Sequence, residues 1–98
     1  MIRVTLPAHL RSLAGTGREV SLEVASPVTQ ASVLNALEAA YPVLKGAVRH
    51  YGSGRRRDFV RFFVDGEDWS LESAERLLPD SITSGREPFR IIGAIAGG

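Results

Sequence analysis

The sequence predicts an α+β fold in which a small mixed sheet carries one main helix on one of its faces. Segments of alternating apolar and polar residues stand at both ends of the chain, and this period of two is typical of strands with one buried side. Between them, apolar residues recur at helical spacing over residues 30–41. A helix that follows a pair of strands is expected to lay its apolar face on their sheet, which gives the α+β arrangement.

The first two strands are predicted over residues 2–6 and 19–24. Apolar residues take every second position, with Ile2, Val4 and Leu6 in the first strand and Val20, Leu22 and Val24 in the second. The compact connection, which contains Gly15-Thr16-Gly17, favours an antiparallel pair. Within it, residues 8–14 are expected to form a short turn-like segment whose Leu10 and Leu13 plug one end of the core.

The main helix is predicted to begin after Thr29 and to end near Tyr41. The Thr29 hydroxyl is suited to accept a hydrogen bond from an unpaired backbone N–H of the first turn, and Pro42 disfavours helical geometry at the residue before it. The predicted apolar face holds Val33, Leu34, Leu37, Ala40 and Tyr41, and the predicted polar face holds Gln30, Asn35 and Glu38. Leu44 and Val48 are expected to anchor a second, shorter turn of helix.

Two more strands are predicted over residues 59–64 and 89–92. The first of these is rich in aromatic and β-branched residues, which favour strands, and Asp65-Gly66 predicts the turn that closes it. Trp69 and Leu71 are expected to cover a core edge, residues 73–78 to form a short helical turn, and residues 79–88 a loop. The first and last strands are expected to lie side by side and parallel at the centre of the sheet.

Composition excludes several classes of function. The chain has 98 residues and is expected to form one domain over residues 1–98. It contains no cysteine, so disulfides, thiolate catalysis and cysteine-ligated metal sites are excluded. The net charge of +1 provides no general attraction to nucleic acid or to an anionic membrane. Because no signal peptide and no apolar run of roughly 18 residues is present, we expect a cytoplasmic protein without membrane or nucleic-acid partners.

Neither catalytic nor metal-binding residues are predicted. His9 and His50 are the only histidines, and neither lies in a motif with the spacing of metal ligands. The serines lack the glycine context that marks a nucleophile. Glu67, Asp68, Glu72 and Glu75 follow a turn, where a solvated surface is favoured over the cleft that acid–base catalysis requires.

A basic loop over Tyr51–Arg57 raises the hypothesis that the protein binds RNA. Arg55-Arg56-Arg57 followed by Phe59-Val60-Arg61-Phe62 overlaps the end of an RNA-recognition strand, on whose aromatic side chains bases stack. However, Arg56, Arg57 and Asp58 stand where that motif requires small or aromatic residues, and two strands precede the first convincing helix. RNA binding is therefore the weaker hypothesis, and the loop is expected to be mobile.

The strand over residues 59–64 predicts a partner-binding surface. Successive side chains of a strand point to opposite faces, so Val60, Phe62 and Val64 share one face and Phe59, Arg61 and Phe63 share the other. Only one face meets the helix, and the other then displays two phenylalanines and an arginine, a composition typical of protein interfaces. The alternative is a face that the chain's own loops cover.

The C-terminal residues Ala94-Ile95-Ala96-Gly97-Gly98 follow the last predicted strand directly. Glycine has no Cβ and wide backbone freedom, so two terminal glycines predict a thin, flexible tail over residues 94–98 that ends in a carboxylate and fits a narrow enzyme channel. The alternative is a frayed terminus without function.

Taken over its whole length, the chain resembles a ubiquitin-like β-grasp protein. The resemblance rests on the two-stranded start, the helix that ends Ala40-Tyr41-Pro42, the strand into Val64-Asp65-Gly66, and the terminal Gly97-Gly98. The chain is similar to the sulfur-carrier family that includes the small subunit of molybdopterin synthase and the thiamine-pathway carrier (MoaD/ThiS type). The stretch Phe59–Asp68 and the ending Ala94–Gly98 also resemble the cysteine-biosynthesis carrier of actinobacteria.

The resemblance implies a carrier chemistry at the C-terminus. An activating enzyme would use ATP to adenylate the Gly98 carboxylate, and a sulfur donor would convert it to a thiocarboxylate that delivers sulfide to a biosynthetic enzyme. Ile95, Ala96 and Gly97 would form the tail that enters these enzymes. The carrier itself would bind no cofactor and would supply no catalytic residue.

Three alternatives remain open at this point. Molybdopterin synthesis and cysteine synthesis are competing pathways, because the basic loop at Arg55–Arg57 and the segment Ser84–Pro88 depart from the family's pattern. A ubiquitin-like modifier that is joined to lysines needs the same tail. A plain protein-interaction module needs no tail chemistry at all.

Overall fold

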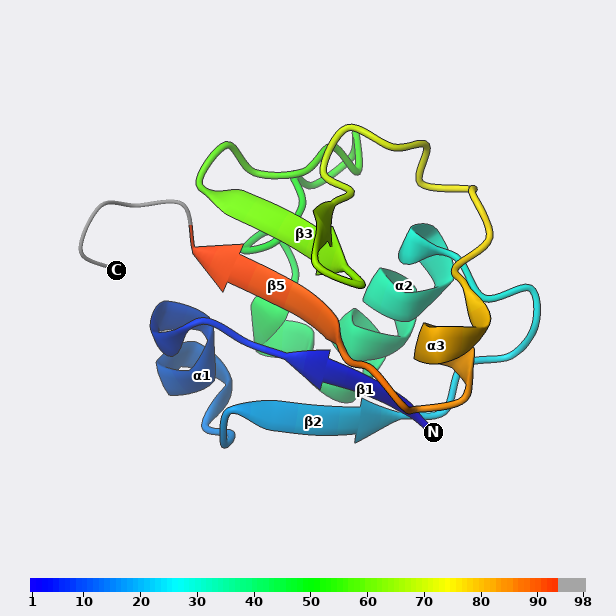
Figure 1. Ribbon diagram of the computed structural model, residues 1–98. Coiled ribbons are helices and arrows are strands. Elements are labelled where there is room, and N and C mark those ends of the chain that lie inside the picture. Colours follow the sequence, from blue (N-terminus) through cyan, green and yellow to red (C-terminus); the bar gives the residue numbers. More distant parts are fainter. Residues whose placement is uncertain (94–98) are drawn as a thin grey trace.

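The computed structural model describes residues 1–93 of the chain, so the predicted tail and its Gly98 carboxylate lie outside the described residues. The elements along the chain are β1 (Ile2–Thr5), α1 (Ala8–Ala14), β2 (Glu19–Leu22), α2 (Gln30–Ala40), the short 3₁₀ helix η1 (Pro42–Leu44), β3 (Val60–Val64), β4 (Glu67–Asp68), α3 (Asp80–Thr83) and β5 (Phe89–Gly93) (Figure 1). The predicted α+β class is confirmed.

The five strands form one mixed sheet in the order β2-β1-β5-β3-β4. β1 and β2 are antiparallel, as predicted, with Ile2 opposite Leu22. β1 and β5 are parallel neighbours at the centre, with Val4 opposite Phe89, which confirms the predicted pairing of the first and last strands. β3 completes the centre by running antiparallel to β5. The first and last strands of the chain therefore lie side by side in the middle of the sheet.

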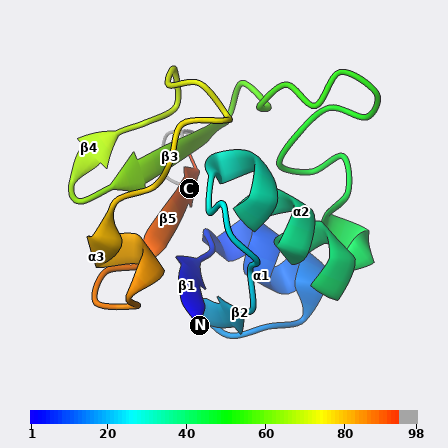
Figure 2. The same cartoon turned by 90° about the vertical axis from the view of Figure 1, so that its right-hand side faces the viewer.

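The main helix α2 packs on one side of this sheet, together with α1 (Figure 2). Its N-terminus is capped as predicted, because the Ser32 backbone N–H donates to Thr29 Oγ1 at 3.1 Å and the Thr29 N–H donates to Ser32 Oγ at 2.8 Å. Val33, Leu34 and Leu37 are buried in the core. Such a capping pair satisfies two backbone donors that would otherwise lack partners, which explains the sharp start of the helix.

The polar face predicted for α2 is wrong at Gln30. This side chain is buried, and its Nε2 donates a 2.8 Å hydrogen bond to the backbone carbonyl of Trp69. A buried carbonyl without a donor is costly, so the loop after β4 needs a polar residue at this point of the helix. Ala40, predicted on the apolar face, is exposed.

The core lies between the helices and the inner face of the sheet. Phe62 of β3 and Phe89 of β5 are buried side by side, with ring centroids 5.4 Å apart. Leu44 and Val48 are fully buried, which confirms that the segment after α2 is anchored in the core. Val60, Phe62 and Val64 all point inward, as the alternation in this strand predicted.

The short elements differ most from the prediction. Residues 8–14 form the helix α1 rather than a turn-like segment, and only Leu10 is buried whereas Leu13 is 48% exposed. Within residues 73–78 only a single turn forms, closed by a 3.1 Å hydrogen bond from the Arg76 N–H to the Ser73 carbonyl, and the helix of this region is α3, inside the predicted loop 79–88. α3 lies at the end of the sheet where β5 begins, and it buries Ile82.

The region after β3 also departs from the prediction at two points. The Asp65-Gly66 turn is confirmed, with φ of 52° and 78°, and the two positive values give the twist that a tight hairpin requires. The acidic residues that follow form a short exposed strand, β4, rather than an open turn. Trp69 is buried as predicted, but Leu71 is 88% exposed and covers no core edge.

Candidate functional site

The candidate site begins at the end of β5, where the described part of the chain stops. Gly93 is still paired with Val60 of β3. On its other side, a Cβ at Gly93 would lie 3.6 Å from both Pro7 Cβ and His9 Cε1. The strand is thus held between β3 and the start of α1 up to its last described residue. Predictions for Gly98 and for Ile95, Ala96 and Gly97 concern residues beyond this point, and they stay predictions.

One face of the central strands carries no helix. On β3 this face presents Arg61 and Phe63, and on β5 it presents Arg90 and Ile92. The four side chains form a compact group, because Arg61 pairs with Ile92 and Phe63 pairs with Arg90 across the two strands. Ile92 is 39% exposed and the other three are half-buried. We call these four residues the open sheet face.

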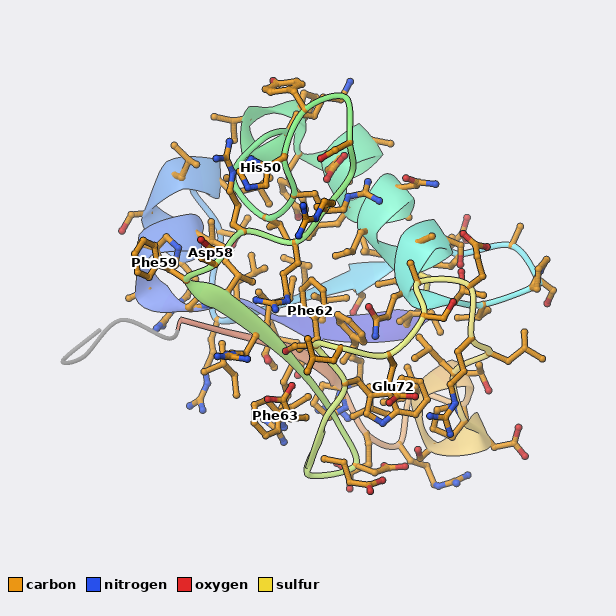
Figure 3. All side chains as sticks on the ribbon, turned by 90° about the horizontal axis from the view of Figure 1, so that it is seen from above. His50, Asp58, Phe59, Phe62, Phe63 and Glu72 are labelled. Carbon is orange, nitrogen blue, oxygen red and sulfur yellow. The ribbon has the colours of Figure 1, made fainter. Side chains whose placement is uncertain are left out.

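The predicted partner residues take two different places. Arg61 and Phe63 belong to the open sheet face, and Figure 3 shows Phe63 on the opposite side of β3 from the buried Phe62. Phe59 lies in the turn before β3, outside the strand, and is 63% exposed. Figure 3 places it beyond the start of the strand and apart from Phe63. Arg90 and Ile92 were not predicted, although the same alternation over residues 89–92 would have placed them on this face.

The charges at the edges of the open sheet face are partly compensated. Asp68 of β4 lies opposite Phe63, and hydrogen bonds from Ser70, with smaller contributions from the charges of Arg61 and Arg56, lower its pKa. On the far side, Arg3 donates two hydrogen bonds of 3.0 Å to Glu19 and lowers the pKa of that carboxyl. Both carboxylates are exposed and stay ionised at neutral pH.

Two arginines of the basic loop are used inside the molecule. Arg56 Nη1 donates to the carbonyl of Val60 at 2.6 Å, and Arg57 Nε donates to the carbonyl of Gly46 at 2.7 Å. Only Arg55 of this triplet is exposed, and the other two arginines are half-buried. The loop is therefore tied to the body by its arginines, which leaves fewer of them for phosphate contacts than the RNA hypothesis requires.

The other polar residues considered from the sequence gather into no recognisable reaction centre. His9 stands on α1 and His50 in the loop after η1, and both are exposed. Glu72 pairs with Arg76, whose guanidinium lies 4.4 Å from the ring centre of Trp69. Within residues 1–93, no group of three or more histidines and carboxylates is arranged to hold a metal ion. In the same residues, no helix has the length and apolar character needed to cross a bilayer.

No family model matches the sequence, and no curated protein matches it either. Solved structures match over nearly the whole chain. CysO in the BexX/CysO complex of Amycolatopsis orientalis superposes with a TM-score of 0.75 at 20% identity, covering 100% of both chains. The small archaeal modifier protein 1 of Methanosarcina acetivorans gives 0.70 at 29% identity, covering 98% of this chain and 94% of its own. CysO of Mycobacterium tuberculosis gives 0.70 at 24% identity, covering 97% and 100%.

These matches decide the fold. The chain has the ubiquitin-like β-grasp fold. Its structural neighbours are small ubiquitin-like proteins of the carrier and modifier kind, which confirms the resemblance drawn from the sequence. In this β-grasp, the central strand β5 ends at Gly93, the last described residue, between β3 and the start of α1 and beside the open sheet face.

Proposed function

We propose that this β-grasp protein is a sulfur carrier whose Gly98 carboxylate is the reactive group. The observation that carries the proposal is the placement of the C-terminal Gly97-Gly98 five residues beyond the central strand of a β-grasp whose neighbours are carriers and modifiers. Five residues span at most about 18 Å when extended. A carboxylate at that distance reaches a buried enzyme centre while the folded body stays outside.

The proposed chemistry has two steps: activation of the Gly98 carboxylate as an adenylate, and replacement of AMP by sulfur. A carboxylate oxygen of Gly98 attacks the α-phosphorus of ATP on a partner activating enzyme, and the bond to pyrophosphate breaks. Hydrosulfide attacks the resulting acyl carbon, the bond to AMP breaks, and the thiocarboxylate remains. AMP is a far better leaving group than the oxide of a free carboxylate, which is why ATP is needed. In this proposal the carrier binds no cofactor, supplies no catalytic residue and works in the cytoplasm.

The open sheet face and Phe59 are proposed to contact the partner enzymes. Aromatic residues and arginine are enriched in protein interfaces, and Arg61 and Phe63 lie on the face that no helix covers. The crystal structure of the neighbour CysO in complex with BexX supports partner binding by a protein of this shape. Molybdopterin synthesis and cysteine synthesis both remain as pathways for the sulfur-accepting enzyme.

A second candidate function is protein modification, because the neighbours include small archaeal modifier proteins, one of them at 29% identity. In this case the amine of a lysine, instead of hydrosulfide, attacks the activated carbonyl and forms an isopeptide bond. Carrier and modifier share the activation step and differ only in the nucleophile.

Mass spectrometry of the chain isolated from its native cell tests the two functions. A carrier shows an intact mass in which sulfur replaces one oxygen. A modifier leaves a remnant on target lysines, and its identity follows from the sequence: trypsin cleaves after Arg90, the last basic residue, so the remnant is Ile91–Gly98. If target lysines carry this remnant and the chain shows no thiocarboxylate, the modifier function replaces the carrier proposal. A C-terminus that the activating enzyme and ATP leave unchanged would contradict both.

A further inference from the structure

A groove of about 310 Å³ lies between the start of α1 and the end of β5. Three arginines from three separate segments line it: Arg11 of α1, Arg18 of the turn before β2, and Arg90 of β5. Thr5 and Ile92 complete the sheet side, and Gly93 stands at the end. We call this feature the arginine groove.

The positive charge of the groove is not compensated within the described residues. No carboxylate lines it, and the ion pairs of residues 1–93 involve Arg3, Arg49 and Arg76 instead. Glu19 is near enough for the charge of Arg90 to act on its pKa. However, both oxygens of Glu19 already accept hydrogen bonds from Arg3. Three arginines therefore line one small groove without an ion-pair partner among the described residues.

One donor of this group is buried without a partner. Arg11 Nε is buried and has no hydrogen-bond partner among the described residues. Buried polar atoms in folded proteins are nearly always paired, so an exception calls for an explanation. A guanidinium presents a planar fork of N–H donors that matches a carboxylate, and hydrogen bonds of this charged kind are short and strong. The arginines that line the groove therefore match the geometry of a carboxylate ligand.

The position of the groove identifies the source of those carboxylates. Gly93 is its last residue before the tail, and Arg90 and Ile92 belong both to the groove and to the open sheet face. An enzyme that takes up Gly98 must pass the root of the tail, so its surface meets this groove. We propose that the arginine groove binds aspartate or glutamate side chains of the enzyme that takes up the C-terminus. The proposal rests on the carrier function proposed above and adds the chemistry of the partner.

A nucleic acid is a poorer occupant of the same groove. Bases of single strands bind on aromatic side chains, and none lines this groove. The small net charge of +1 also provides little long-range attraction to a polyanion. An acidic peptide segment matches the three guanidinium groups without needing stacking.

The test uses an acetylated hexaglutamate peptide as the probe and hexaglutamine as the uncharged control. Titration of the isotope-labelled chain, followed by NMR, is expected to shift the amide signals of Thr5, Arg18 and Ile92 with hexaglutamate only. The double variant Arg18→Gln/Arg90→Gln is expected to bind about tenfold more weakly, which corresponds to about 1.4 kcal/mol. The single variant Arg86→Gln removes one positive charge beyond the opposite end of β5, where the double variant removes two from the groove, and it is expected to bind like the parent protein. Arg11→Gln is a further variant, whose folding is checked by its NMR spectrum.

Two results would overturn the proposal. One is hexaglutamate binding that Arg86→Gln weakens as much as the double variant does, or that maps to the loop Arg55–Arg57. The other is tighter binding of hexathymidylate than of hexaglutamate in the groove, which would assign it to nucleic acid. The titration needs neither ATP nor a reactive C-terminus. Failure of the groove and failure of the carrier function are therefore seen in separate experiments.

Discussion

Gly97 and Gly98 are the residues on which the proposed chemistry depends most directly. We expect that deletion of Gly98, or Gly97→Phe, abolishes adenylation because the reactive carboxylate is displaced or a side chain blocks the enzyme channel. The thermal midpoint is expected to stay unchanged, since the described core extends only from Ile2 to Ile91. Adenylation is measured as ATP–pyrophosphate exchange on the cognate activating enzyme.

The control variant introduces the same phenylalanine side chain at an exposed position away from the tail. Ala39 is exposed on α2, and Ala39→Phe is expected to be activated like the parent protein. Normal adenylation of the Gly98 deletion would show that the terminal carboxylate is not the activated group. Loss of adenylation in Ala39→Phe would show that the assay responds to any added aromatic ring.

Arg3 and Glu19 provide a pH-dependent prediction at the same scale. Hydrogen bonding by Arg3 lowers the pKa of Glu19 in the folded chain, so the folded state binds a proton at this site less readily than the unfolded state. The contribution of Glu19 to stability is therefore present above the ordinary carboxyl pKa and is lost as pH falls through the lowered, folded-state pKa. Arg3→Gln is expected to raise the pKa of Glu19 toward its ordinary value, as followed by NMR titration.

Asp68 is the internal reference for that titration. Its pKa is lowered mainly by hydrogen bonds from Ser70, so Arg3→Gln is expected to leave it in place, whereas Ser70→Ala is expected to raise it. An unchanged Glu19 pKa in Arg3→Gln would contradict the hydrogen-bonding cause.

The two faces of β3 are expected to have different roles, one in stability and the other in partner binding. Phe62 is buried against Phe89, so Phe62→Ala is expected to cost about 3–5 kcal/mol of stability. Its neighbour Phe63 points to the open sheet face. Phe63→Ser is expected to lower stability by only about 1 kcal/mol but to cost about 2 kcal/mol or more of affinity for the activating enzyme, roughly thirtyfold. Urea unfolding and calorimetric binding measure the two quantities.

The opposite pattern would reverse this assignment. If Phe63→Ser destabilised the fold as much as Phe62→Ala and still bound the enzyme normally, the open sheet face would be a structural surface. Phe59 would then be the remaining predicted contact near the end of β5, because it is exposed and precedes Val60, the partner of Gly93.

At the scale of elements, regular patterns were predictable and short elements were not. Alternation in β3 was sufficient to place Phe62 inside and Phe63 outside, because a strand has only two faces. α1 and α3 have seven and four residues, too few for a helical period to appear, and helices of this length depend on tertiary packing. Gln30 was misplaced because its partner is a carbonyl 39 positions away in sequence, which no local pattern shows.

The candidate site could likewise be predicted from the sequence only in part. The tail and the residues Arg61 and Phe63 follow from sequence order and strand parity. The arginine groove could not be predicted, because Arg11, Arg18 and Arg90 come from three segments that only the folded sheet brings together. The parallel pairing of β1 with β5 joins them.

Over the whole molecule, the distribution of amines limits where one copy of the chain could be joined to another. Lys45 is the single lysine among 12 basic side chains, and it is exposed directly after η1. Arginine stays protonated in proteins and does not attack an activated carbonyl, whereas a lysine amine does. Chains of linked copies therefore have only two acceptors, Lys45 and the N-terminal amine of Met1.

The carrier function predicts that Lys45→Arg leaves the yield of thiocarboxylate unchanged, because no amine takes part in activation or in attack by hydrosulfide. The measurement is the intact mass after incubation with activating enzyme, ATP and sulfide. Omitting sulfide provides the sensitive comparison: the activated carbonyl then meets only water and amines, and any self-linked dimer should disappear in Lys45→Arg or retain its link solely at Met1. A fall in thiocarboxylate with Lys45→Arg, at an unchanged thermal midpoint, would mean that this amine takes part in the reaction or in the enzyme contact, and the tail would no longer account for carrier activity alone.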